Sequence, residues 1–336
     1  AQQTGTNTAH IAIPRRILIA THDRKFIQQA CDQLANDPTI QIQWQPWISH
    51  FEPAQALTVA SDVDTVFCEW CCENAVWHSH NKAKGCKLIV RLHRFEAMQD
   101  FGTRVNWSAV DALIVVSDHF RQLVICRVGV DPKIIHVVPQ YINWAELQRP
   151  KLTEARFTLG LVGINPFDQK RFDRALDFLV ALRRHDQRFT LAVRSVMPWQ
   201  IDWVWQNRPD SRDQVIDTFR RVYTDPVLAG AVRFDPPGSD MEEWYRGIGT
   251  ILSSSDSEGC HTAVIEGIAS GCYAVVHDWP GARGLFARFV QSDMQHAIAD
   301  TISFADQPDL AAARAHQSAQ MRAYDLQHFI TTVLAL

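Results

Sequence analysis

Short runs of almost uninterrupted apolar residues recur along the chain, and segments with helical spacing separate them. In the first half, the runs that we interpret as strands are Arg15–Ala20, Asp64–Cys68, Lys87–Leu92, Asp111–Val116 and Ile134–Val138. Near-continuous apolar character is typical of strands in a parallel sheet, because helices cover both faces of such a sheet. This half therefore predicts a Rossmann-like domain, with ligands at the carboxyl ends of its strands.

The same alternation returns in the second half. Its predicted strands are Phe157–Val162, Phe189–Arg194, Val232–Phe234, Ile251–Ser255 and Ala274–Val276. Helical spacing marks a long helix from about Lys170 to Arg184, another over Arg212–Tyr223, and a helical tail from Leu310. The chain is thus predicted to be an α/β protein with two Rossmann-like domains.

The periodicity lapses over Tyr141–Leu152, where a proline stands between charged residues, and we place the domain boundary there. We expect a disordered linker over residues 1–12 and a first domain over 13–148. The second domain is expected over 149–315, and a C-terminal helix over 316–336 that crosses back to the first domain.

Composition narrows the class of protein. The 336 residues suit two domains, and a net charge of −4 provides no electrostatic reason to expect nucleic acid as a partner. We find no apolar run of membrane-spanning length and no signal-peptide core. The eight cysteines are scattered, which favours reduced thiols and a cytoplasmic location. Cys68 and Cys71 have no second pair at zinc-site spacing, so we expect no metal there.

The stretch Ser253–Val276 predicts a strand end, a polar turn, a helix over about Thr262–Ala269 and a second strand. Glu258 lies in the turn and Glu266 lies inside the helix. Gly259 lets the turn backbone approach a ligand, and the free N–H groups at the helix start favour an anion. The alternative is an ordinary connection with two solvated glutamates.

Lys170 is expected to begin the helix after the first strand of the second half, beside the helix start that follows Glu258. Two neighbouring helix starts and a lysine would suit a diphosphate, and Arg171 is a further candidate to bind it. The alternative is a solvated lysine. The segment Gly160–Gly163 is too poor in glycine for a dinucleotide fingerprint, which argues against NAD.

These residues resemble the motifs of the family-4 retaining glycosyltransferases, which have the two-domain GT-B fold with parallel sheets facing across a cleft. The family's Gly-x6-Lys segment resembles Gly163–Lys170, and its Glu-x7-Glu motif resembles Ser255, Glu258, Gly259 and Glu266. The small-residue run after that motif resembles Gly267–Gly271. In the first domain, His93 resembles the family's strand-ending histidine, and Val116–Ser117 resembles its Val-Ser before a helix. The resemblance extends over nearly the whole chain from Arg15.

The resemblance implies transfer of a sugar, with retention, from a nucleotide-diphosphate sugar to a glycan or lipid-linked acceptor. Such an enzyme would act in the synthesis of surface polysaccharide or glycoconjugates, and would need no metal or cofactor. By this resemblance Lys170 would neutralise the diphosphate, Glu258 would contact the donor sugar and Glu266 the ribose. The residues that would line the donor are Gly163, Arg171, Gly259, Cys260, His261 and Thr262, and His93 would face the sugar from the acceptor-side domain.

Two positions depart from the family pattern. Ile164 stands where an arginine is usual, and Arg171 or Arg194 is a candidate replacement; ATHDRKF, residues 20–26, replaces a glycine-rich loop. A nucleotide-sugar epimerase of the same fold and a non-catalytic module that binds a sugar or a partner both remain open. Contact with a partner domain or a membrane surface also remains open, although no basic amphipathic helix supports the latter. Trp279, at a predicted strand end, is a candidate to stack on a sugar.

Overall fold

The computed structural model describes residues 14–291, 293–307 and 309–336, so the predicted linker over residues 1–12 lies outside the described part. The chain divides into two compact units. The first extends to Val116 and adds Phe120–Val138 and Thr332–Leu336, and the second consists of Ser117–His119 and Pro139–Thr331. Each unit contains one six-stranded sheet whose paired strands are all parallel. The prediction of an α/β chain with two Rossmann-like sheets is confirmed.

The first sheet has the strand order β2-β1-β3-β4-β5-β6. Its strands are β1 (Arg15–Thr21), β2 (Ile40–Pro46), β3 (Thr65–Glu69), β4 (Lys87–Leu92), β5 (Ala112–Val115) and β6 (Ile135–Val137). The helices between them are α1 (Gln28–Leu34), α2 (Glu73–His80), α3 (Arg94–Ala97), α4 (Phe101–Arg104) and α5 (Asp118–Val128). The direction of winding reverses between β1 and β3, and such a reversal opens a crevice above the strand ends.

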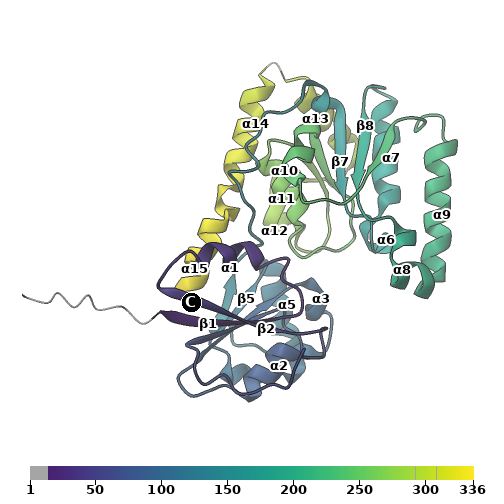
Figure 1. Ribbon diagram of the computed structural model, residues 1–336. Helices are drawn as coiled ribbons and strands as arrows, with labels where there is room; N and C mark the ends of the chain where they lie inside the picture. Colours follow the sequence, from purple (N-terminus) through teal and green to yellow (C-terminus); the bar gives the residue numbers. More distant parts are fainter. Residues whose placement is uncertain (1–13, 292, 308) are drawn as a thin grey trace, which may run out of the picture. The chain divides into compact units, whose positions relative to one another are not determined.

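The second sheet has the order β12-β11-β10-β7-β8-β9. Figure 1 labels two neighbouring strands of this sheet, β7 and β8. Its strands are β7 (Thr158–Val162), β8 (Thr190–Arg194), β9 (Val232–Asp235), β10 (Thr250–Ser253), β11 (Tyr273–His277) and β12 (Val290–Gln291). The helices are α6 (Phe167–Lys170), α7 (Phe172–Arg183), α8 (Asp202–Asn207), α9 (Pro209–Thr224), α10 (Met241–Trp244), α11 (Thr262–Ala269), α12 (Ala282–Phe286), α13 (Met294–Ala305), α14 (Leu310–Ala319) and α15 (Leu326–Ala335). Here the winding reverses between β7 and β10.

Side chains of alternating orientation build the two faces of the second sheet. Leu159, Leu161 and Leu252 belong to the same apolar cluster as α7 and α13, which pack against each other. On the other face α11 packs on β10, with Gly267 directly over Ile251. A Cβ added at Gly267 would lie 2.7 Å from the Ile251 Cβ, so a glycine is required for this close approach. The position of α11 matters because Glu258 lies in the turn before this helix and Glu266 lies within it.

The structure corrects several predicted elements. Lys170 does not begin the long helix: it is the last residue of the short helix α6, and Arg171 separates α6 from α7. The elements that were not predicted are the strands β2 and β12 and the helices α2, α3, α4, α6, α8, α12 and α13. The tail forms two helices, α14 and α15, with a 3-10 turn over Gln320–Tyr324 between them. In the described part, no helix combines the length and the apolar character that spanning a membrane requires.

Candidate functional site

Lys170 and Glu258 meet at the reversal point of the second sheet. Lys170 follows β7 and Glu258 follows β10, and these two strands are neighbours in the sheet. The Lys170 Nζ lies 2.5 Å from the Glu258 Oε1, and Ser255 Oγ donates a hydrogen bond of 2.6 Å to the same oxygen. Both charged side chains are largely buried. Because each follows the end of its strand, the pair lies at the carboxyl edge of the sheet, where α/β sheets bind ligands.

The local sequence around Lys170 explains its orientation. Phe167 and Phe172, on either side of it, are fully buried and anchor α6 and α7 in the core. Arg171 takes a left-handed backbone conformation, with φ of 51°, which lets the chain turn between these anchors. The carbonyl of Lys170 accepts a hydrogen bond of 2.8 Å from Ser254 Oγ. Both the backbone and the side chain of the lysine are therefore bonded to the turn that follows β10.

Glu258 is ionised in this environment. Burial alone would raise the pKa of its carboxyl, but the neighbouring His261 and Lys170 and the hydrogen bonds from Lys170 and Ser255 lower that pKa to about 2. Burial lowers the pKa of His261 to about 4, so the imidazole carries a charge that favours the Glu258 carboxylate only in acid; near pH 7 it is neutral and Lys170 supplies the positive charge. The site thus holds one compensated ion pair that an incoming anion can rearrange.

His261 precedes α11 in a left-handed conformation, with φ of 46°, which is uncommon for a residue other than glycine. Trp279 Nε1 donates to Ser253 Oγ at 3.1 Å, and Ser253 Oγ lies 2.6 Å from His261 Nδ1. The serine hydroxyl therefore links the His261 ring to the Trp279 indole in a buried chain of hydrogen bonds. Among the described residues, His261 Nε2 is buried without a hydrogen-bond partner. The other ring nitrogen, Nδ1, lies 3.8 Å from Glu258 Oε1.

Glu266 lies one turn further along α11. Tyr245, which is fully buried, directs its hydroxyl to Glu266 Oε2 at 3.1 Å and to the Ala263 carbonyl at 2.8 Å. Burial raises the pKa of Glu266 to about 7, against the opposing effect of the Tyr245 hydrogen bond, although the side chain keeps a partly exposed surface. The carboxyl therefore becomes a full hydrogen-bond acceptor only toward higher pH.

Two other positions explain the departures from the family pattern. Gly163 has φ of 74°, a conformation that side chains rarely adopt, and Ile164 after it is fully buried in the apolar core. Arg171 pairs with Asp173 and Asp256, and Arg194 pairs with Asp240. Neither arginine bonds Lys170 or Glu258. The remaining predicted positions, Gly259, Cys260 and Thr262, lie in the connection to α11 and at its first residue.

His93 lies in the first unit, at the end of β4. Its Nε2 is 2.8 Å from the Oε1 of Glu69, a carboxylate that is fully buried and is also 3.4 Å from Arg91. The aromatic rings of Trp70 and Phe26 lie 4.5 and 4.9 Å from the imidazole. His93 is therefore fixed at the carboxyl end of β4 by a buried carboxylate and by two rings.

Sequence reasoning missed Ser253 and Tyr245, which hold His261 and Glu266. Their positions carry no local signal, because each acts through a residue that the fold brings close. Trp279 is 2% exposed and bonds Ser253, so it supports His261 and has almost no surface with which to stack on a sugar. In the described residues, no cluster of three or more His, Cys, Asp or Glu side chains suits a metal ion.

Neither a family model nor a curated protein matches this chain. Solved structures do. The HepE protein of Anabaena, in complex with UDP and glucose, matches with a TM-score of 0.67 and 11% identity, covering 96% of this chain and 98% of that one. A glycosyltransferase from Rickettsia africae matches with a TM-score of 0.68 and 13% identity, covering 96% and 97%. The pneumococcal O-GlcNAc transferase GtfA, in complex with UDP and GlcNAc, matches with a TM-score of 0.55 and 13% identity, covering 81% of this chain and 56% of that one. At these identities the likeness shows the fold, which is that of the GT-B glycosyltransferases.

Proposed function

We propose that this protein is a retaining glycosyltransferase that moves a sugar from a nucleotide-diphosphate sugar to a glycan or lipid-linked acceptor. The observation that carries the proposal is the pair Lys170–Glu258 at the reversal between β7 and β10. Ligands of open α/β sheets bind at such reversals, and the start of α11 beside the pair adds N–H donors. The GT-B fold supports this reading, because solved proteins of that fold are described with UDP and a sugar.

In the proposed reaction, the bond between the anomeric carbon and the diphosphate oxygen breaks. The oxygen of an acceptor hydroxyl bonds to that carbon, and its proton passes to the departing diphosphate. Negative charge accumulates on the leaving diphosphate. Lys170 would leave Glu258 to pair with this charge, and the N–H groups at the start of α11 would share it. No metal ion is needed in this scheme, since protein donors stabilise the leaving group.

Glu258, once released from Lys170, would accept hydrogen bonds from the donor sugar. Glu266 would accept the ribose hydroxyls, and the backbone from Gly259 to Thr262 would line the sugar and phosphates. His93 would contact the sugar from the first unit. Synthesis of surface polysaccharide or glycoconjugates is the role that we propose for this activity, with the enzyme in the cytoplasm.

The test is transfer or hydrolysis of a nucleotide sugar by the purified chain, beginning with UDP-glucose and UDP-GlcNAc. Lys170→Ala and Glu258→Ala should each lower kcat/KM roughly 30- to 1000-fold, which corresponds to about 2–4 kcal/mol of transition-state stabilisation. Lys133→Ala and Glu154→Ala replace exposed residues of the same types and should change nothing. Full activity in both site variants would refute the assignment. Product analysis without an acceptor distinguishes an epimerase, and absence of nucleotide-sugar binding would favour a non-catalytic module.

A further inference from the structure

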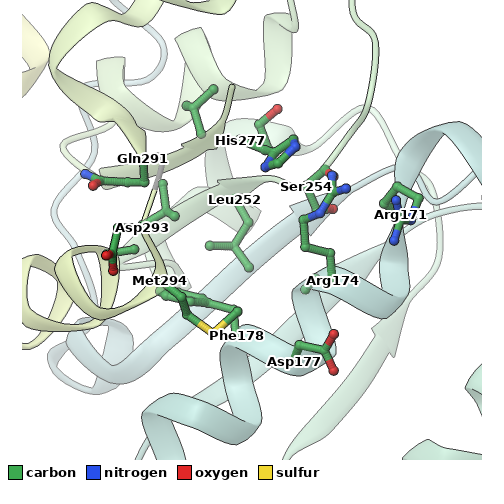
Figure 2. Close-up of a pocket in the computed structure, with 15 residues that line it drawn as sticks. Arg171, Arg174, Asp177, Phe178, Leu252, Ser254, His277, Gln291, Asp293 and Met294 are labelled. Carbon is green, nitrogen blue, oxygen red and sulfur yellow. The ribbon is translucent and has the colours of Figure 1, made fainter. Parts of the chain in front are cut away.

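A cavity of about 350 Å³ lies within the second unit (Figure 2). Of the residues that the sequence suggested for the donor, Arg171 lies in its wall. It opens between α7, α13 and the ends of β10 and β11. Lys170, Glu258, His261 and Glu266 do not line it. Its volume lies in the range of about 300–1,000 Å³ that small-molecule sites occupy.

The floor of the cavity is apolar. It consists of Ala175, Phe178, Leu252, Val275, Met294 and Ala297. Most of these side chains belong to the core, but Met294 at the start of α13 is 43% exposed. A ligand that covers this surface removes apolar area from water, so its body must be apolar.

The charged side chains at the rim already have partners. Asp256 accepts from Arg171 at 3.0 Å and from Arg174 at 2.7 Å. Asp177 pairs with Arg221 at 2.6 Å, and Asp293 accepts from the backbone N–H groups that begin α13. A charged ligand would have to displace one of these partners and leave a charge uncompensated, which makes its binding costly.

His277, at the end of β11, gives the rim a neutral polar group. Burial, followed by repulsion from the charge of Arg174, lowers the pKa of this imidazole below its usual value. Near pH 7 the ring is therefore uncharged and offers one hydrogen-bond donor and one acceptor. Figure 2 shows His277 and Arg174 on one side of the cavity and Gln291 and Asp293 on the other.

We propose that this cavity binds a small uncharged molecule with a flat apolar body and a hydrogen-bonding edge, such as a substituted aromatic ring. The apolar floor would contact the body of the molecule, and His277 would hydrogen-bond to its polar edge. The site is distinct from the donor site but shares a wall with it. Ser253 and Ser254 line the cavity, and their hydroxyls bond His261 Nδ1 at 2.6 Å and the Lys170 carbonyl at 2.8 Å.

The shared wall has a consequence for the donor residues. A molecule in the cavity touches the serines that hold His261 and Lys170, so its binding changes the affinity for the donor without competing with it. By linkage, the donor changes the affinity for this molecule by the same factor.

The test titrates the purified chain with benzamide and benzoate, which have similar shapes and differ in charge, by ligand-observed NMR or calorimetry at pH 7.5. We expect benzamide to bind with a Kd of about 1 mM, as suits a ligand of this size, and benzoate at least tenfold more weakly. Met294→Trp fills the cavity and should weaken benzamide binding at least tenfold. Met98→Trp is the matched control, because Met98 is 44% exposed in the first unit.

The outcomes separate clearly. Absence of benzamide binding, or equal binding to Met294→Trp, would overturn the site, and tighter binding of benzoate would overturn the uncharged class. Strict competition between benzamide and a nucleotide sugar would show that the cavity belongs to the donor site. These titrations need no donor, so they remain informative even if the chain transfers no sugar.

Discussion

The Nζ of Lys170 lies 2.5 Å from Glu258 Oε1, although 88 positions separate the two residues in the sequence. The two largely buried charges of the pair compensate each other. Removing one partner leaves the other charge buried and unpaired, whereas a bound anion can replace Glu258 as the partner of the lysine. The same contact thus contributes to stability and prepares a cation for a ligand.

The ionisation of Glu258 makes stability depend on pH in acid. The pKa of this carboxyl is about 2 in the folded chain and near 4.5 when unfolded, so its contribution is present above pH 4.5 and is lost as the pH falls toward 2. We expect the difference in unfolding free energy between wild type and Glu258→Gln to shrink by about 2 kcal/mol between pH 5 and pH 3. Urea unfolding at each pH measures it. Glu154→Gln, at an exposed position, should show no such dependence.

The hydroxyl of Tyr245 should control the pH at which the donor binds. Burial raises the pKa of Glu266 to about 7, and the Tyr245 hydrogen bond opposes that rise. In the proposed site the ionised carboxylate would accept the ribose hydroxyls, so donor affinity should increase as the pH rises through this value. Tyr245→Phe should move the midpoint to higher pH, whereas Tyr223→Phe, at a 75% exposed position, should leave it in place. A Kd series from pH 5.5 to 9 tests this, and an unmoved midpoint in Tyr245→Phe would contradict it.

Gly267 should resist even the smallest side chain. Its added Cβ would lie 2.7 Å from the Cβ of Ile251, so α11 would have to move away from β10. We expect Gly267→Ala to lower the free energy of unfolding by about 1–3 kcal/mol. Gly284→Ala in α12 is the control, because a Cβ there meets no atom within 4 Å and alanine favours a helix. Denaturant midpoints of the two variants should therefore shift in opposite directions, or only the first should shift.

The buried carboxylate of Glu69 should be required for the stability of the first unit. Glu69 and Arg91 are both fully buried, and the arginine would lose its counter-charge in Glu69→Ala. Breaking a buried pair in this way costs about 3–5 kcal/mol. Asp217→Ala removes the partner of Arg220 on the exposed face of α9 and should cost less than about 1 kcal/mol. Thermal unfolding followed by circular dichroism compares the two; equal shifts would refute the role of Glu69.

Local pattern was sufficient for most strands and for α11. The runs around Leu88, Leu113 and Leu159 are apolar on both faces because helices cover both sides of these strands, so their composition alone identifies them. The missed strand β2 lies at the edge of its sheet and alternates apolar and polar residues, as IQIQWQP shows. Its pattern of period two was a usable signal. The prediction placed Lys170 at the start of the long helix α7, whereas it ends the short helix α6. The left-handed turn at Arg171 separates the two helices, and no glycine marks this turn in the sequence.

The sequence alone determined the α/β class, the two parallel sheets and the residues at the strand ends, because apolar periodicity and chain direction are local properties. Only the tertiary structure decided which of those residues meet. The strand order places β7 beside β10, and this brings Lys170 to Glu258, while Ser253 holds the His261 ring and Tyr245 holds Glu266. Such contacts depend on strand neighbours far apart in the chain, and the burial that shifts these pKa values exists only after the second sheet has packed against its helices.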